Sequence, residues 1–482
     1  MDIGNPQEKA SSSFSSQSHV LIFPFPVQGH VNSMLKLAEL LCFAGVNVTF
    51  LVSENVHSRL LLHSDVDRRF SDVHPGAFQF KIYSDGLPQE DPRSGLEFLV
   101  HLHSCLKTTI KEFFLDDYAL NSGPLGPPTC IISDGVMSFV LDVGEEKGIP
   151  VIYFRTIGAS SFWCYFRLPH LIDSGEFPFQ GTDLDLPIQN VTGMEGFLRR
   201  RDLPSICRGD LNNNPGLQAI MNETLQTRRA WGLILNTFED LEGPVLLQIR
   251  TQIPNVYTIG PLHAHSKIRL AETIEMKRDV VSSTSNSLWK EDRISCMSWL
   301  DSKPNNSVIY VSFGSLSILT REQLVEFWHG LVSSGKCFLW VIRPESIVDG
   351  DGGVPRELEV GTKERGYIVG WAPQEEVLGH RAVGGFLTHS GWNSTLESID
   401  HGLPMICWPY FLDQQVNSRL VESLWALGLD MKDICDRLVV KRMIDELMDA
   451  KRDEFKKRAE HFAKLSHKAI TSGGCLTQIW IA

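Results

Sequence analysis

The sequence lacks several features that define other classes of protein. No apolar run reaches the roughly eighteen residues that a membrane-spanning helix needs. The first residues have neither a basic start nor an apolar core, which excludes a secretory signal and predicts a disordered tail over 1–18. The ten cysteines show no C-x-x-C spacing, so neither a disulfide framework nor structural zinc is indicated. We therefore expect a cytoplasmic protein.

Basic stretches and several cofactor motifs are also missing. The formal net charge is −13, and no Lys/Arg-rich run offers a surface for a phosphate backbone, which argues against a nucleic-acid partner. No G-x-G-x-x-G follows the first apolar run, as a nicotinamide-dependent oxidoreductase would require. The histidine pairs at 101 and 103 and at 263 and 265 have no further ligands in metal-binding spacing, so we expect no metal.

The sequence does contain enough apolar residues for two cores. Its 482 residues are 43% apolar and 21% charged, which fits two domains of roughly 200 to 250 residues each. In the first half, short apolar runs alternate with helical spacing that begins near Ser33, which predicts a parallel sheet covered on both faces. We assign 19–259 to an N-terminal Rossmann-like domain. Its expected strands lie at 19–24, 46–52, 129–134 and 151–154.

A second set of strands follows a polar passage. Residues 260–291 are polar and Ser-rich, which predicts an interdomain linker and loop. Apolar runs at 307–314, 337–342 and 383–389 then predict a second Rossmann-like domain over 292–460. The fold class is thus α/β, with two parallel sheets and ligands in the crevice at the carboxyl ends of the strands.

The segment from Trp371 to Gln414 carries the strongest functional signal. Ser394 and Glu397 have the spacing of a capping box, which predicts a helix start at 392–395 that can attract an anionic phosphate beside His389. Capping boxes also occur on helices that bind nothing. The neighbouring residues favour a ligand, because Trp371 offers a flat face for a base. Asp413 and Gln414 supply acceptors and donors for sugar hydroxyls.

Two residues of the first half suit acid–base chemistry. His30 follows the first predicted strand and Asp134 ends another, so both lie at the edge where a Rossmann-like domain exposes functional groups. A histidine there can remove an acceptor proton while the carboxylate orients its ring. Position alone also allows a surface histidine and an aspartate that only caps a helix.

These motifs resemble those of the plant family 1 UDP-glycosyltransferases. The match covers 371–414 nearly throughout, and Pro26 to Asn32 and Ser133-Asp134 stand where the family carries its catalytic His and Asp. The resemblance implies the GT-B fold, with two Rossmann-like domains facing across a cleft. Ser33 replaces a common proline, which should affect loop stiffness more than chemistry, and Ser390 replaces a common cysteine, a small change that should matter little.

The resemblance also implies roles for individual residues. Trp371 would stack on uracil, with Ala372 and Gln374 at the base or ribose and Glu397 on the ribose hydroxyls. A tryptophan at 392 with a glutamine at 414 goes with glucose as the donor. The expected diphosphate contacts are Ser315, His389, Asn393 and Ser394, and the expected sugar contacts are Trp392, Asp413, Gln414 and the weaker match Thr156.

The acceptor is the least defined part of the prediction. Segment 428–433, GLDMKD, resembles plant enzymes that glucosylate iridoids such as 7-deoxyloganetic acid. Aromatic and apolar side chains in the first half would line the acceptor pocket, or would simply fill the core. The residues expected to line it are Met137, Phe154, Phe162, Trp163 and Phe166.

We therefore predict an inverting UDP-glucosyltransferase, in which UDP-glucose is a co-substrate and no separate cofactor is needed. It would move glucose to a hydroxyl or carboxyl of a small lipophilic terpenoid or phenolic metabolite, and we expect a monomer. The alternative is a non-catalytic UDP-sugar-binding protein. Residues 461–482 should form a helix that packs back on the N-terminal domain, and their final LTQIWIA is shorter than the usual family end, which we interpret as a truncation.

Overall fold

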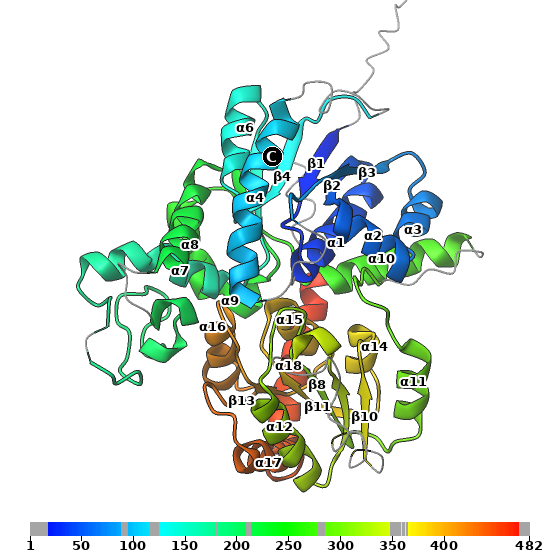
Figure 1. Ribbon diagram of the computed structural model, residues 1–482, viewed down its shortest axis with the longest axis vertical. Helices are drawn as coiled ribbons and strands as arrows, with labels where there is room; N and C mark the ends of the chain where they lie inside the picture. Colours follow the sequence, from blue (N-terminus) through cyan, green and yellow to red (C-terminus); the bar gives the residue numbers. More distant parts are fainter. Residues whose placement is uncertain are drawn as a thin grey trace, which may run out of the picture.

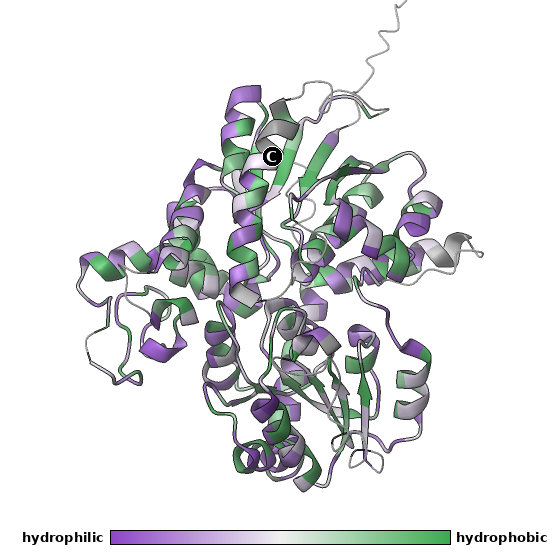
Figure 2. Ribbon diagram, viewed as in Figure 1, coloured by the Kyte–Doolittle hydropathy of each residue, from purple (hydrophilic) through white to green (hydrophobic). Residues whose placement is uncertain are grey.

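The computed structural model contains two parallel β-sheets, each covered by helices (Figure 1). It describes residues 18–87, 95–115, 125–179, 181–208, 214–277, 285–347 and 365–471, with the single residues 358 and 362. The predicted tail over 1–18 and the final segment after 471 therefore lie almost wholly outside the described residues. Most strands are green in Figure 2, and most strand residues are buried, as expected for sheets with helices on both faces.

The N-terminal sheet has the order β3-β2-β1-β4-β5-β6-β7. The order reverses between β1 and β4, which pair in parallel through registers such as Ile22 with Ile132. This reversal leaves a crevice at the carboxyl ends of the two strands. The strands are β1 (His19–Phe23), β2 (Asn47–Ser53), β3 (Phe78–Tyr83), β4 (Cys130–Asp134), β5 (Val151–Arg155), β6 (Gly232–Leu235) and β7 (Val256–Thr258).

The C-terminal sheet repeats this plan with the order β10-β9-β8-β11-β12-β13. Its reversal lies between β8 and β11. The prediction of two Rossmann-like α/β domains is confirmed, and every strand expected from the sequence is present. The strands are β8 (Val308–Ser312), β9 (Cys337–Val341), β10 (Gly366–Val369), β11 (Val383–Thr388), β12 (Met405–Cys407) and β13 (Gly428–Asp430).

Helices connect successive strands and cover the sheets. Those of the first half are α1 (Gln28–Phe43), α2 (Glu54–His63), α3 (Val66–Val73), α4 (Gly95–Leu115), α6 (Phe139–Lys147), α7 (Ala159–Asp173), α8 (Pro215–Leu225), α9 (Glu239–Gln252) and α10 (Leu262–Lys277). Those of the second half are α11 (Arg293–Asp301), α12 (Arg321–Ser333), α14 (Gln374–Leu378), α15 (Trp392–Asp400), α16 (Gln414–Arg419), α17 (Arg437–Asp445) and α18 (Arg452–Thr471).

Two local predictions need correction. Helix α1 begins at Gln28 instead of near Ser33, so His30 lies in its first turn and not in a preceding loop. Residues 262–277, predicted as part of a loop, form α10. The helical period was hidden because several buried positions of α10 are polar: His263 faces Asp400, and Ser266 donates a hydrogen bond to Glu39 at 2.6 Å.

The last described helix returns to the N-terminal half. Helix α18 packs on α15 and α9, and Lys468 pairs with the exposed Asp240 of α9 at 3.0 Å. Deeper in this junction, Asp400 accepts a hydrogen bond from Ser466 at 2.6 Å and lies 3.4 Å from His263. Burial alone would raise the pKa of Asp400, but its bonds with His263 and Ser466 hold it below its ordinary value. A single carboxylate thus joins α10, α15 and α18.

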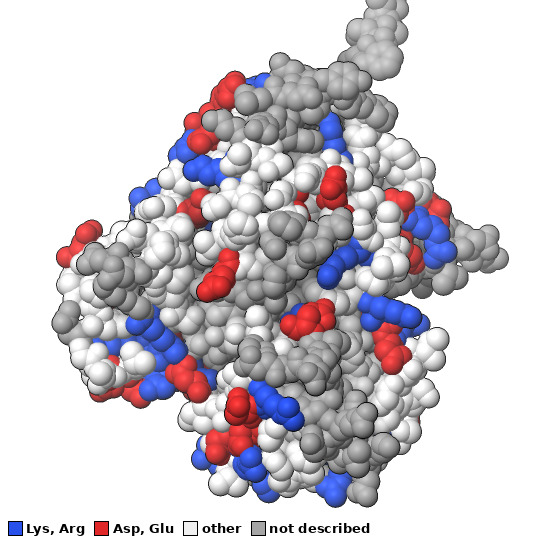
Figure 3. Space-filling view, viewed as in Figure 1, with Lys and Arg blue, Asp and Glu red and all other residues white. Residues whose placement is uncertain are grey.

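The exposed surface offers no concentrated basic patch in the view of Figure 3, where acidic and basic side chains are interspersed. In the described part of the chain, no helix combines the length and apolar character needed to cross a membrane.

The Asp400 junction gives a stability prediction. Asp400→Asn should lower the apparent Tm by about 5 °C. The Asp400 carboxylate stays charged and paired at neutral pH, and the substitution removes this buried charge from the helix junction. Asp240→Asn is the matched control. It breaks an exposed pair with Lys468 of α18, the helix that also carries Ser466, and should shift Tm by less than about 1 °C. Differential scanning calorimetry on both variants would contradict the assignment if the two shifts were equal.

Candidate active site

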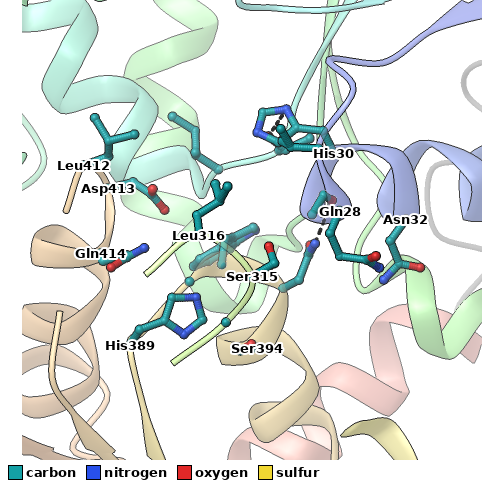
Figure 4. Close-up of a pocket in the computed structure, with 18 of the residues that line it drawn as sticks. Gln28, His30, Asn32, Ser315, Leu316, His389, Ser394, Leu412, Asp413 and Gln414 are labelled. Atoms are coloured by element: carbon teal, nitrogen blue, oxygen red, sulfur yellow. Dashed lines mark hydrogen bonds between the residues drawn. The ribbon is translucent and has the colours of Figure 1, made fainter. Parts of the chain in front are cut away.

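A cavity of about 440 Å³ lies between the two domains, at the carboxyl ends of both sheets. Its walls include residues that follow β1 and β5 on one side and β8, β11 and β12 on the other. Figure 4 shows His30 on one side and His389, Asp413 and Gln414 on the other, with Ser315 between them. The two points where the strand orders reverse therefore open onto one shared space.

His30 and Asp134 form a hydrogen-bonded pair at this cavity. His30 Nδ1 lies 2.5 Å from Asp134 Oδ2, and the side chains are 25% and 1% exposed. The backbone N–H of Phe25 and that of Val136 also donate to the Asp134 carboxylate, at 3.4 and 3.3 Å. Because the carboxylate binds Nδ1, the Nε2 atom of His30 is the ring nitrogen left for an acceptor. The Thr156 hydroxyl lies 3.3 Å from Nε2.

A buried cation supports this pair from behind. Arg155 ends β5, is buried, and donates to the Gly135 carbonyl at 2.6 Å. Burial lowers the pKa of Arg155, and the nearby Asp134 charge opposes that shift. The fit is close, since a Cβ added at Gly135 would lie 2.4 Å from Arg155 Cδ. Arg155 was not singled out from the sequence, because a polar residue at a strand end carries no distinctive spacing.

His389 is held between two glycines. A Cβ added at Gly314 or at Gly391 would lie 2.5 Å from His389 Nε2, so only glycine leaves room for the ring on each side. Burial, followed by the charge of Arg343, lowers the pKa of His389 to about 4. The ring is therefore neutral near pH 7 and can donate one hydrogen bond. It stands beside the start of α15, whose first N–H groups are open toward the cavity.

Arg343 and Trp289 connect the turn at Gly314 to Trp371 on the wall of the cavity. Arg343 donates to the carbonyls of Gly314 and Ser317 at 3.3 and 3.1 Å, and its guanidinium lies 5.6 Å from the Trp289 ring centre. Trp289 stacks on Trp371 with ring centres 4.7 Å apart. Trp371 borders the cavity, whereas Trp289 is not among its described wall residues, so Trp289 supports the indole from behind. No motif in the sequence marked either Arg343 or Trp289.

Gln374, Ser394 and Glu397 form one network. Gln374 donates from Nε2 to Glu397 at 2.7 Å and to Ser394 at 2.9 Å. The predicted helix start is confirmed, since α15 begins at Trp392, but the capping box is wrong. The N-cap is Gly391 without a side-chain cap, because Ser394 and Glu397 already lie inside the helix and face Gln374.

The charge of this network depends on a contact from the other domain. Burial and then the neighbouring Glu375 raise the pKa of Glu397. Burial also acts to raise the pKa of Glu375, but Lys36 of α1 pairs with it and lowers its pKa to about 2. Lys36 is buried, so this ion pair forms only when the domains are in contact.

Asn393 and Trp392 also reach the N-terminal domain. Asn393 Nδ2 donates to the Gly29 carbonyl at 2.9 Å, and Ser33 Oγ lies 2.9 Å from Asn393 Oδ1. Ser33 therefore contributes a contact between the domains, where we expected only an effect on loop stiffness. The Trp392 indole is buried and donates to the Asn236 carbonyl at 2.8 Å, so its N–H faces the other domain, although Trp392 is also one of the residues that border the cavity.

Asp413 and Gln414 form the tip of the opposite wall. Gln414 Oε1 accepts from the backbone N–H groups of Tyr410 and Phe411 at 2.8 and 3.0 Å, which leaves its NH2 group to donate into the cavity. Asp413 Oδ2 accepts from Asn417 at 2.8 Å. Burial raises the pKa of Asp413 to about 6, although the Asn417 bond opposes the shift.

The chain matches known proteins along nearly its whole length. Residues 249–468 match the family described as UDP-glucoronosyl and UDP-glucosyl transferase, and residues 16–115 match a glycosyltransferase N-terminal domain. The 7-deoxyloganetic acid glucosyltransferase of Catharanthus roseus is 56% identical over 95% of this chain and 94% of its own. The 7-deoxyloganetin glucosyltransferase of Gardenia jasminoides is 40% identical, over 96% of each chain.

This chain belongs to the plant family 1 UDP-glycosyltransferases.

Solved structures agree with that assignment. Os79 from O. sativa in complex with UDP gives a TM-score of 0.75 at 26% identity, over 95% of this chain and 98% of its own. Medicago truncatula UGT71G1 complexed with UDP-glucose gives 0.73 at 25% identity, over 95% and 96%. The GT-B fold and the enzyme class of UDP-glucosyltransferase are thereby confirmed, and so is the family that the sequence motifs indicated.

The structure of this UDP-glycosyltransferase brings one part of the predicted site residues together and leaves the other part in the core. The predicted donor residues and Thr156 all border one cavity, which also includes His30. The five expected acceptor residues do not border it: Met137, Phe154, Phe162, Trp163 and Phe166 are at most 4% exposed and belong to the core. The alternative that they fill the interior is the better interpretation, because α7 is buried on nearly all sides.

Other residues line the cavity on the side of His30. The apolar walls there come from α4, α8, segment 205–208 and the loops after β1, β4 and β5. Polar groups interrupt these walls, and one of them is Glu223, which accepts from the backbone N–H and hydroxyl of Ser138 at 2.7 and 2.9 Å and lies 3.4 Å from His103 Nε2. The described apolar wall residues here are Phe25, Val27, Leu99, Val100, Val136, Ile157, Ile206, Ala219 and Ile220.

The described residues give no evidence of a metal-binding site. The described residues contain no group of three or more His, Cys, Asp or Glu placed to hold a metal ion. The expectation that the UDP-glycosyltransferase needs no metal stays a prediction.

The glycine pair around His389 gives a binding prediction. Gly391→Ala should weaken UDP binding about tenfold, because the added methyl must displace the imidazole from the start of α15. Isothermal titration calorimetry with UDP measures the change. Gly243→Ala is the control, since a Cβ there meets no atom within 4 Å. Unchanged UDP affinity in Gly391→Ala would show that the ring position does not matter for the donor.

Proposed function

We propose that this enzyme transfers glucose from UDP-glucose, with inversion, to a hydroxyl or carboxyl of a small lipophilic plant metabolite of the iridoid type. The observation that carries the proposal is the His30–Asp134 pair at 2.5 Å, on the wall opposite Asp413 and Gln414 within one cavity. The names of relatives in Catharanthus roseus and Gardenia jasminoides, both iridoid glucosyltransferases, support the acceptor class.

The proposed reaction is a single displacement. His30 Nε2 takes the acceptor proton as the acceptor oxygen forms its bond to the anomeric carbon of glucose. The bond between that carbon and the diphosphate oxygen breaks, and its electron pair leaves with UDP. Asp134 keeps Nδ1 protonated and stabilises the imidazolium that forms. Because the oxygen enters opposite the leaving UDP, the configuration inverts.

UDP-glucose would be held by uncharged hydrogen-bond donors and by one more distant positive charge. The start of α15 presents N–H groups to the diphosphate, and the neutral His389 adds one more donor. Arg343 lies behind the Gly314 turn and contributes positive potential without bordering the cavity itself. Trp371 would stack on uracil, and Glu397 would bind the ribose hydroxyls in the place now taken by Gln374.

Glucose would be recognised by Asp413 and Gln414. The Gln414 NH2 group donates and the Asp413 carboxylate accepts, which suits two neighbouring hydroxyls of a hexose. The acceptor would lie against the apolar walls from α4 and α8, with a polar substituent near His103 and Glu223. A small, mostly apolar acceptor with one or two oxygens fits this distribution.

The catalytic pair predicts a difference between acceptor types. His30→Ala should lower kcat about a thousandfold with a hydroxyl acceptor, because its proton must be removed during attack. With a carboxylic acid acceptor, which is already ionised near pH 7, kcat should fall no more than about tenfold. Transfer from labelled UDP-glucose measures both.

The outcomes of this assay separate the alternatives. Equal and complete loss with both acceptors would contradict a role of His30 in proton removal alone. If the wild-type protein binds UDP-glucose but transfers it to no acceptor in a panel of terpenoids and phenolics, it is a non-catalytic UDP-sugar-binding protein instead.

Asp413 predicts a pH dependence of donor binding. Its pKa of about 6 means that the carboxylate, which accepts sugar hydroxyls, is protonated as the pH falls through 6. At pH 5 the wild-type affinity for UDP-glucose should therefore be about tenfold weaker than at pH 7.5. Asp413→Asn should bind UDP-glucose more weakly at pH 7.5 and lose this part of the pH profile. Parallel profiles for the two proteins in fluorescence titrations would refute the assignment.

A further inference from the structure

Segment 428–433, the GLDMKD sequence, has no role in the site described so far, yet it lies against the N-terminal domain. Asp430 ends β13, and Lys432 and Asp433 follow it. Lys432 and Asp433 have partners in segment 199–208, which includes the short helices η1 (Arg200–Asp202) and η2 (Ser205–Arg208). Contacts between the segments cross from one domain to the other.

Asp202 is the centre of this contact. It is 0% exposed, and its carboxylate faces a cation of its own domain, Arg199, at 2.9 Å. Two cations of the C-terminal domain reach it as well: Lys432 Nζ at 2.9 Å and Arg419 Nε at 3.3 Å. Burial would raise the pKa of Asp202, but Arg199 and Lys432 hold it below its ordinary value. The carboxylate is therefore a buried anion shared by both domains.

Lys432 carries this contact to α16. Its ammonium donates to the Gln415 carbonyl at 2.7 Å and to the Ser418 hydroxyl at 2.8 Å, and it pairs with Asp430 at 3.0 Å. These acceptors, together with Asp202, surround a buried ammonium. The backbone of Lys432 has φ 49°, a conformation uncommon outside glycine. The contacts of the ammonium group stabilise Lys432 in this conformation.

At the outer edge of the contact, more exposed side chains form another ion pair between the domains. Arg208 pairs with Asp433 at 2.5 Å and donates to the side chain of Gln415 at 3.2 Å. Helix α16, which begins with Gln414, is therefore bonded to the N-terminal domain through Gln415 and Arg419. Its first turn carries the residue that presents an NH2 group to the cavity.

We propose that Asp202 is a positioning residue that fixes α16, and with it the Asp413–Gln414 tip, from across the cleft. The inference rests on the proposed function, in which that tip binds the sugar of the donor. UDP lacks the hexose, so its binding does not need the tip. Asp202 accordingly acts on the recognition of the hexose and not on that of the nucleotide.

Asp202→Asn and Lys432→Met test the proposal. Each should weaken UDP-glucose binding about tenfold while leaving UDP binding within about twofold of wild type, measured by calorimetry at pH 7.5. The double variant should be no weaker than the worse single variant, because both remove the same contact. In turnover assays, KM for UDP-glucose should rise more than kcat falls. Asp185→Asn is the matched control, since Asp185 pairs with Arg199 and Arg201 at the exposed end of the same segment.

The outcomes distinguish this inference from the proposed function. A wild-type protein that fails to bind UDP-glucose would overturn the proposed function. Wild-type binding with an equal loss of UDP and UDP-glucose affinity in Asp202→Asn would overturn the positioning role alone. If Asp202→Asn does not fold, Asp433→Asn decides, because Asp433 is exposed and the substitution breaks its pairs with Arg208 and Arg201 without touching the buried Asp202. It should raise the Kd of UDP-glucose by about threefold without changing that of UDP, and no change would refute the inference.

Discussion

A parallel sheet covered by helices on both faces can offer functional groups only at the ends of its strands, and this constraint organises the whole protein. Helices cover the faces of both sheets, so the reversal of strand order in each leaves one crevice at the carboxyl ends. The chain places His30 and Asp134 at the first crevice and Ser315 and His389 at the second. Because the two crevices open onto one cavity, each domain supplies one of its walls.

Buried polar contacts join the two halves. Lys36 with Glu375, Ser33 with Asn393 and the Trp392 indole with Asn236 all cross the cleft. Buried charges and amides are costly without partners, so these contacts make the arrangement specific as well as stable. The same contacts touch residues that border the cavity, which links the relative placement of the domains to the geometry of the donor site.

Sequence patterns predicted the strands and the residues that share one wall of the cavity because both depend on local signals. Apolar runs mark strands, and 371–414 is a continuous motif that forms α14, β11, α15 and β12 and ends at the start of α16. His30 and Asp134 were found because each directly follows or ends a strand whose place in the sheet the pattern fixes.

The remaining features depend on distant contacts. Helix α10 was missed because its buried positions are histidine and serine, whose partners lie in other helices. Trp289 and Arg343 act through a stack assembled from separate segments. The aromatic residues of α7 were assigned to the pocket because side-chain type does not show whether a helix borders a cavity or the core. Ser394 and Glu397 have capping-box spacing, but Gln374 bonds to both and the helix begins earlier.

The His263–Asp400 contact also bears on how enzymes of this family can be recombined. Helix α10 packs on α1 and so belongs with the first half, yet its histidine faces a carboxylate of the second. A chimera that joins the first half of this chain to the second half of a relative therefore breaks more than the polypeptide at the junction. Unless the foreign half brings an acid at 400, a lysine at 432 and a glutamate at 375, it leaves the buried His263, Asp202 and Lys36 of the first half without these partners.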